Sequence, residues 1–450
     1  MKLLLQQAVD GIATHKHPGR MLVDDEATRW LAGSGLVYAK VLAGSGDMIG
    51  FGPEGASAVG ALTRALRSSS AVYRRGISHS VFAKAIADQV ISLFGASSPT
   101  VDDAAVRTFE ANIGAWWNGV TGPRRHLIPC TVVPGAAADV VVGPVTFVHA
   151  SRIVGHPLGL EQDHFLTDLA LQNIGRALAE RAAAWIAIVE IAGCHPSRSS
   201  EIADLSVDVA LTALQLIVPL THSRDMARLT ARTAPPWRGN LTITDTEISP
   251  GVENNQPGLG LLAADFGTMV SSGQPVLDAA GRRLAGFVTG KGALDCINQA
   301  WCDAAYWFHE GLAEPLDTVA VAKLETAVEV LLRAESSKGS GKRMRQAIEA
   351  VTGLAAKDPI APGSLVTVAE FAKGLVGARS QVLHGTFSTL TAELAPERSS
   401  ITELAYMLLM TFALQIDAFA SSVAAADDVD ALLGWIHAQR AASASAASPP

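Results

Sequence analysis

Arg379 and His384, five positions apart, are the two side chains of this 450-residue chain that best fit a chemical task. An arginine guanidinium holds phosphate oxygens through a planar fork of N–H donors. A histidine titrates near neutral pH, so its imidazole can give or take a proton. Cleaving an RNA phosphodiester without a metal requires a base for the 2′-hydroxyl proton, a cation for the charged phosphate and an acid for the leaving 5′-oxygen. The pair therefore fits phosphodiester chemistry on RNA.

The two side chains lie on a segment, residues 367–385, that has the pattern of one helix. Thr367 and Glu370 form a T-x-x-E capping box, in which each side chain accepts a hydrogen bond from a free N–H group at the helix start. Gly385 follows the last periodic residue, where a helix commonly ends in a left-handed conformation. The spacing of the apolar residues predicts one buried stripe, made of Phe371, Leu375, Ala378 and Val382.

Arg379 and His384 lie outside that stripe. At about 100° per residue, Arg379 is roughly 60° from the stripe centre and His384 is nearly opposite it. Five positions place the two side chains about 140° apart on one ideal helix, so a single copy does not make a compact site. His384 is in the last turn, where the helix dipole favours the protonated imidazole. That position suits an acid or a phosphate clamp better than a resting base.

The string RSQVLHG, from Arg379 to Gly385, resembles the signature of the HEPN superfamily of helical nucleases, in its Apea-like branch. That signature is an Arg, a polar neighbour and then a His, here Arg379, Ser380 and His384. The family often has Asn, Asp or His in the position of Ser380. The resemblance covers about residues 300–440 and includes KLETAVEVLL, which is similar to the family's first long helix.

The resemblance implies a metal-independent endoribonuclease with Arg379, Ser380 and His384 as catalytic residues and with no cofactor. In the family, two chains pair so that both Arg/His motifs face one cleft. A homodimer through the C-terminal bundle is therefore implied here. The family also implies a toxin or an anti-phage defence effector, in which an N-terminal part senses an unknown trigger or restrains the nuclease.

The segment KGSGKR, residues 338–343, predicts a basic glycine loop. It is not a phosphate-binding loop of the nucleoside triphosphatases, because no strand precedes it and Arg343 stands where that motif has Ser or Thr. Since the net charge is −8, any RNA contact must come from a local basic patch. The predicted RNA-phosphate contacts are Lys338, Lys342, Arg343 and Arg345.

Composition indicates a globular protein without a predicted metal site. Hydrophobic residues make up 49% of the chain and charged residues 17%, which excludes a disordered chain. The four cysteines are too few for a disulfide framework, and Cys296, Cys302 and His309 lack a standard zinc spacing. A reduced, cytoplasmic setting is expected. The start lacks the apolar core of a signal peptide, and the apolar run 404–414 is shorter than a membrane span, so we expect a buried core helix and no membrane.

The chain as a whole predicts an α+β fold, with a mixed α/β N-terminal part followed by an all-α HEPN-like bundle. We expect an α+β region at 1–155, a second at 156–292 that is either a separate domain or part of the first, the bundle at 293–440 and a disordered tail at 441–450. Periodicity predicts helices and strands within these regions. The expected helices are 79–95, 160–184, 401–420 and 427–440, the expected strands are 127–133, 140–150, 185–193 and 240–248, and the expected loops are 44–55 and 250–260.

Three functional hypotheses remain open at this point. The first is the metal-independent endoribonuclease. The second is a non-catalytic HEPN-like module for RNA binding or protein assembly, because an exposed Arg and a His in the last turn are also ordinary helix features. The third is an unrelated small-molecule enzyme with its site in residues 1–290, which would require a deep pocket in that part of the chain.

Overall fold

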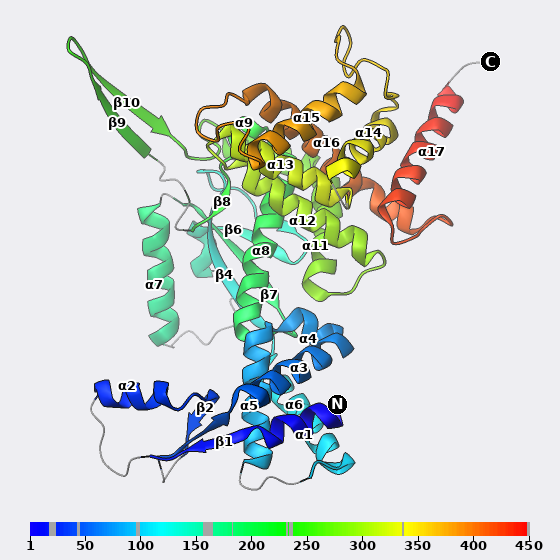
Figure 1. Ribbon diagram of the computed structural model, residues 1–450. Helices are drawn as coiled ribbons and strands as arrows, with labels where there is room; N and C mark the ends of the chain where they lie inside the picture. Colours follow the sequence, from blue (N-terminus) through cyan, green and yellow to red (C-terminus); the bar gives the residue numbers. More distant parts are fainter. Residues whose placement is uncertain are drawn as a thin grey trace. The chain divides into compact units, whose positions relative to one another are not determined.

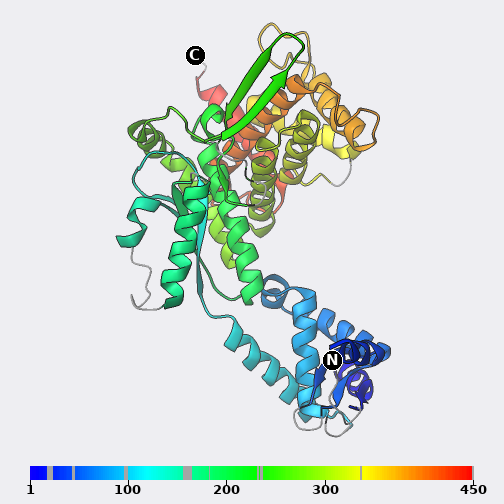
Figure 2. The same ribbon diagram turned by 90° about the vertical axis from the view of Figure 1, so that its left-hand side faces the viewer.

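The computed structural model describes residues 1–17, 24–42, 46–95, 100–155, 165–181, 183–230, 233, 237–334 and 337–447, and the protein is an α+β fold (Figure 1, Figure 2). The chain divides into two compact units, 1–124 with 191–201 and 125–190 with 202–450. The boundaries expected at 155 and 292 both fall inside the second unit. Strand pairing crosses the first of them and helix packing crosses the second.

The first unit packs helices on a small antiparallel sheet with the strand order β1-β3-β2. The predicted helix at 79–95 is confirmed as α5, and its apolar face forms the core with Phe82, Ile86 and Val90 fully buried. Part of the segment expected to be a glycine loop is instead the strand β3, buried along its whole length. The elements are α1 (Lys2–Asp10), β1 (Ile12–His15), α2 (Asp24–Gly33), β2 (Val37–Val41), β3 (Met48–Phe51), α3 (Pro53–Ser69), α4 (Ala71–Gly76), α5 (His79–Phe94) and α6 (Asp103–Val120).

The second unit begins with a five-stranded sheet in the order β5-β6-β7-β4-β8. The strands predicted near 127–133, 140–150 and 185–193 are confirmed, the second as the hairpin β5–β6. Its turn contains Gly143 at φ +56, and a Cβ there would collide with the backbone of Gly281. The elements are β4 (Arg124–Thr131), β5 (Val140–Val142), β6 (Val145–His149), η1 (Ala150–Gly155), α7 (Phe165–Glu180), β7 (Trp185–Ile191), α8 (Pro196–Gln215), α9 (Leu220–Ser223) and β8 (Ala227–Arg228). The first residues of the helix expected at 160–184 lie outside the described residues.

An antiparallel hairpin of β9 (Trp237–Ile243) and β10 (Ile248–Asn254) extends from the second unit (Figure 1). The prediction of a half-buried strand at 240–248 is wrong, because this segment includes the turn and all of β9 is exposed. The prediction of a loop at 250–260 is wrong for residues 250–254, which are part of β10. The alternation that suggested burial is real, since the apolar side chains share one face, but that face is exposed: Trp237, Leu241, Ile243, Ile248 and Val252.

The rest of the second unit is helical and starts before residue 293. The helices are α10 (Ala263–Ser272), α11 (Gln274–Thr289), α12 (Asp295–Leu312), α13 (Asp317–Leu331), α14 (Ser337–Thr352), α15 (Val368–Leu383), α16 (Ala395–Ala420) and α17 (Val429–Ala447). α13 packs against α12, α15 and α16. Within the described part of the chain, α16 is the one helix long and apolar enough to cross a membrane. One apolar face of α16, which includes Leu408, Phe412 and Ile416, is buried against neighbouring helices, as predicted for a core helix.

Three local predictions in the bundle are wrong. Residues 338–343 are not a loop but part of α14, where Met344 just beyond them is fully buried. α16 begins at Ala395, six residues before the expected start at residue 401. The C-terminal tail is helical as far as Ala447, because α17 continues beyond residue 440. All four cysteines are free, with Cys130, Cys194 and Cys302 buried and Cys296 exposed.

Candidate functional site

Helix α15 carries the three predicted catalytic residues, and both of its ends match the sequence prediction. The Thr367 hydroxyl accepts a hydrogen bond from the Glu370 N–H at 3.3 Å, and the Glu370 carboxylate accepts one from the Thr367 N–H at 2.9 Å. Gly385 follows the helix with a left-handed φ of +69. Leu375, Ala378 and Val382 are buried, so the predicted stripe faces the bundle. These signals fix where the helix starts and ends and which side chains face outward.

Arg379 is held by two carboxylates of α13. Its Nε lies 3.0 Å from Glu325 Oε2, and its Nη1 lies 2.9 Å from Glu329 Oε2. Glu325 and Glu329 are four positions apart, so they lie on the same face of α13. The Ser340 hydroxyl of α14 donates a hydrogen bond to the other carboxylate oxygen of Glu329. One polar cluster therefore joins α13, α14 and α15.

The Glu325 carboxyl of this cluster is fully buried, and burial disfavours its charged form. Burial and, to a smaller extent, the nearby Glu329 carboxylate raise the pKa of Glu325 to about 8, against the opposing effect of Arg379. Near neutral pH, Glu325 therefore holds a proton. The charge of Arg379 is then balanced by Glu329.

His384 is at the opposite side of the same helix end. It is the residue that follows α15, it is exposed, and its backbone N–H donates to the Ser380 carbonyl oxygen at 3.0 Å. Ser380 is half-buried one turn earlier. Arg379 contacts the carboxylates of α13 while His384 is exposed, so one chain does not bring the two side chains into a single site.

A basic cavity lies between α14 and α15. Lys342 and Arg345, both predicted RNA contacts, line this cavity of 350 Å³ together with Lys373. Glu370 is also in the lining, where hydrogen bonds from Thr367 and, to a smaller extent, the charge of Lys373 lower the pKa of its carboxyl. Lys373 was not among the predicted RNA contacts. Its spacing indicates the role, because Lys373 lies seven positions before Ser380 and eleven before His384. At about 100° per residue, both of these side chains therefore lie within about 20° of the direction of Lys373 around the helix.

The other two predicted RNA contacts are not part of this cavity as described. Arg343 donates to the Leu332 carbonyl oxygen and pairs with Asp430 of α17 at 3.1 Å. It therefore holds α14 against the end of α13 and against α17. Lys338 lies in the first turn of α14, and its side chain is outside the described part of the structure.

The described residues contain no group of three or more His, Cys, Asp or Glu side chains placed to hold a metal ion. Comparisons with protein families, with curated proteins and with solved structures found no match. Function is therefore inferred from the chemistry of the site. The site contains three cationic side chains, of the type that can bind phosphate, and one exposed imidazole, of the type that can transfer a proton.

Proposed function

We propose that the chain is a HEPN-type, metal-independent endoribonuclease in which His384 transfers a proton. The observation that carries this proposal is the shared face of α15, where His384 and Ser380 follow Lys373 of the basic cavity. The fold supports it as well. The helix with KLETAVEVLL, α13, packs directly on the helix with RSQVLHG, α15, and the two resembling segments are joined by the ion pairs of Arg379.

Each residue has a definite role in the proposed reaction. Lys342, Arg345 and Lys373 bind RNA phosphates, which contribute most of the affinity in such contacts. The 2′-oxygen bonds to phosphorus as its proton passes to water, the P–O5′ bond breaks, and His384 gives a proton to the leaving 5′-oxygen. Arg379 uses Nε and Nη1 for Glu325 and Glu329, which leaves Nη2 for a phosphate oxygen.

The proposed active form is a homodimer through the C-terminal bundle. Because Arg379 and His384 diverge on α15, a complete site requires the Arg of one chain and the His of another, or both motifs in one cleft. The resemblance further suggests a cytoplasmic toxin or anti-phage effector, with the N-terminal part sensing a trigger. Light scattering on the purified chain measures the mass, and a monomer under conditions that support cleavage would contradict the dimer.

A second candidate function is a non-catalytic RNA-binding or assembly module. The specific observation that favours it is the pairing of Arg379 with two carboxylates, which competes with phosphate for the guanidinium. This module would keep the basic cavity between α14 and α15 and would bind RNA without cutting it.

Cleavage of labelled mixed RNA and of tRNA in EDTA tests the proposal. We expect wild type to cut and His384→Asn to cut about 10²–10⁴-fold more slowly, because a positioned proton donor contributes that much to the rate. His384 is exposed, so this change leaves the fold intact. His437→Asn, at an exposed histidine of α17, is the matched control and should cut like wild type.

Two outcomes would contradict the proposal. Equal cleavage rates for wild type and His384→Asn would mean that His384 does not take part in the reaction. RNA binding without cleavage, weakened when Lys342, Arg345 and Lys373 are changed to Gln, would instead favour the binding module. Slow growth of a host that expresses wild type but not His384→Asn would support the nuclease independently.

A further inference from the structure

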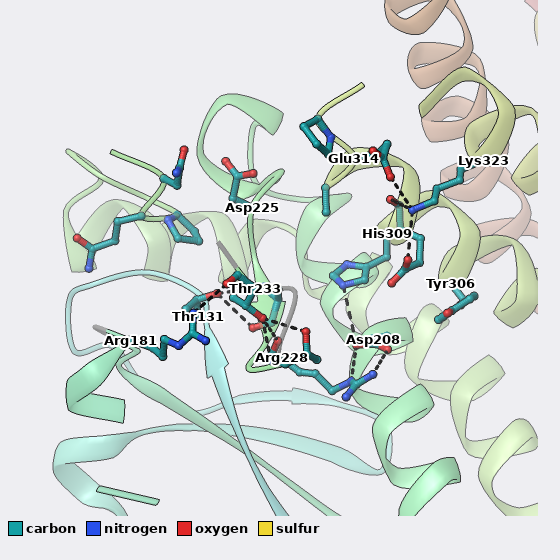
Figure 3. A pocket seen from close by; sticks show the side chains of 18 residues that line it. Thr131, Arg181, Asp208, Asp225, Arg228, Thr233, Tyr306, His309, Glu314 and Lys323 are labelled. Atoms are coloured by element: carbon teal, nitrogen blue, oxygen red, sulfur yellow. Dashed lines mark hydrogen bonds and ion pairs between the residues drawn. The ribbon is translucent and has the colours of Figure 1, made fainter. Parts of the chain in front are cut away.

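A second cavity of the same unit is lined by residues of β8, α8, α12 and α13 rather than by α15 (Figure 3). Its volume is 560 Å³, within the range of about 300–1,000 Å³ that is usual for small-molecule sites. The side chains that matter here are Asp208, Arg228, Tyr306, His309, Glu310 and Lys323. Because α12 and α13 supply four of these six side chains, the cavity is not the one in residues 1–290 that the small-molecule hypothesis required.

The hydrogen atom of the buried His309 ring can be assigned from its neighbour. The Gln215 amide nitrogen donates to two backbone carbonyls, those of Ser223 at 3.1 Å and Arg224 at 3.4 Å. The Gln215 amide oxygen must therefore be the atom that lies 3.1 Å from His309 Nδ1. Since this oxygen only accepts, Nδ1 carries the hydrogen and donates it.

The other ring nitrogen of His309 is therefore a fixed hydrogen-bond acceptor. Burial lowers the pKa of His309 to about 4, so the ring is neutral at physiological pH and Nε2 has a free lone pair. Nε2 faces Asp208 Oδ1 at 3.9 Å (Figure 3). That separation is too long for a direct hydrogen bond.

Burial raises the pKa of the Asp208 carboxyl, and the bidentate pairing with Arg228 opposes this effect and favours the carboxylate. Asp208 Oδ1 and Oδ2 accept hydrogen bonds from Arg228 Nε at 2.8 Å and Nη2 at 3.0 Å. Oδ1 has a second lone pair left for another donor. Two acceptors, His309 Nε2 and Asp208 Oδ1, thus face each other across a gap that a donor with two hydrogens would bridge. A hydroxyl group has one hydrogen and satisfies only one of them.

The charges around the gap favour a cation. Arg228 pairs with Asp208 and also lies 3.4 Å from Asp204. Across the cavity, Lys323 pairs with Glu314 at 3.0 Å and with Glu310 at 3.4 Å. Arg181 and Asp225 also line the cavity, so five carboxylates lie around three cations, which disfavours phosphates and other anions.

We propose that this cavity binds a small molecule with a primary amino group, whose N–H groups bridge His309 Nε2 and Asp208 Oδ1. The Tyr306 ring and the α12–α13 wall enclose the carbon chain of the ligand. The site shares no side chain with the proposed nuclease site on α14 and α15, so either can be tested without the other.

The test uses the full-length protein and three probes of equal chain length. These are 1,4-diaminobutane, its fully methylated bis-quaternary analogue and 1,4-butanediol. The diamine has charge and N–H donors, the quaternary compound has charge alone, and the diol has single O–H donors. We expect binding by the diamine in calorimetric titration and at least about 10-fold weaker binding by the other two, because charge-assisted hydrogen bonds contribute about 1.5–3 kcal/mol each.

Two variants locate the binding. Ala313→Trp places an indole at the mouth of the cavity from an exposed position, so it should abolish binding without disturbing the core. His309→Phe removes the acceptor and should weaken binding by at least about 10-fold. Ala425→Trp, at an exposed alanine outside the cavity, is the matched control and should bind like wild type.

Each other result overturns the proposal. No diamine binding up to about 10 mM, where a Kd of about 1 mM would be nearly saturated, would mean that only water bridges the two acceptors. Equal binding of the quaternary analogue would mean that the cavity attracts any cation and that the two acceptors do not contribute to binding. Undiminished binding to Ala313→Trp would place the amine elsewhere on this acidic protein.

Discussion

The buried carboxyl of Glu325 makes the stability of the bundle depend on pH. Its pKa rises from the ordinary 4.5 to about 8 in the folded protein. A group whose pKa is raised on folding contributes stability that is complete below the unfolded pKa and is lost as the pH rises through the folded value. The free energy of unfolding should therefore fall between about pH 5 and pH 9.

Glu325→Gln should flatten that profile, because the amide keeps the shape of the side chain and does not titrate. Urea denaturation at a series of pH values measures the effect. Glu393→Gln, at an exposed glutamate, is the control and should keep the slope of wild type. If Glu325→Gln also keeps that slope, another group is responsible for the pH dependence.

The same cluster shows what could and could not be predicted for single residues. That Arg379 lies off the buried stripe and that His384 ends the helix follow from local spacing alone. The partners of Arg379 do not, because Glu325 and Glu329 come from another helix and only packing brings them together. The approach of His309 to Asp208 could not be predicted either, because the two residues lie on different helices, α12 and α8, that only packing brings together.

At the scale of single elements, the start of α15 has a measurable stability contribution. Thr367→Ala removes the hydroxyl that accepts the Glu370 N–H, and loss of such a cap costs about 1 kcal/mol. Thr386→Ala, at an exposed threonine just beyond the same helix, should change stability by less than about 0.5 kcal/mol. Both are measured by chemical denaturation, and equal losses would mean that the capping box is not needed.

Helix α16 offers a matched pair of leucines. Leu408 is fully buried and Leu414 is 42% exposed. Leu408→Ala should therefore lower the free energy of unfolding by about 2–5 kcal/mol, because a cavity opens in the core. Leu414→Ala should cost far less. Similar losses at both positions would mean that α16 is not packed as a core helix.

The elements that were predicted wrongly have two different physical causes. Residues 338–343 contain two glycines, which disfavour helix by about 1 kcal/mol each, but tertiary packing of α14 outweighs this preference. In the β9–β10 hairpin, Pro250 and Gly251 suggested a loop, yet an exposed strand edge tolerates both. Elements with caps at both ends, such as α15, were predicted well because their signals are local.

The organisation of the whole molecule was the least predictable feature. The first unit takes residues 191–201 from the middle of the chain, and β6 pairs with β7 across the α7 segment. Such long-range contacts do not change the local composition. The domain boundaries at 155 and 292 were placed where the pattern of helices and strands changes, and they therefore do not coincide with the two units. The general division into an α+β N-terminal part and a helical C-terminal part was nevertheless confirmed.

The four free thiols report on the opening of each unit separately. Cys296 is exposed, although the Asp427 carboxylate raises its pKa and slows its reaction. The buried thiols are Cys194 in the first unit and Cys130 and Cys302 in the second. A short pulse of maleimide during a denaturant ramp, followed by peptide mass spectrometry, would therefore mark each unit at the moment it unfolds. The buried cysteines of the native chain are therefore sufficient to determine which unit unfolds first.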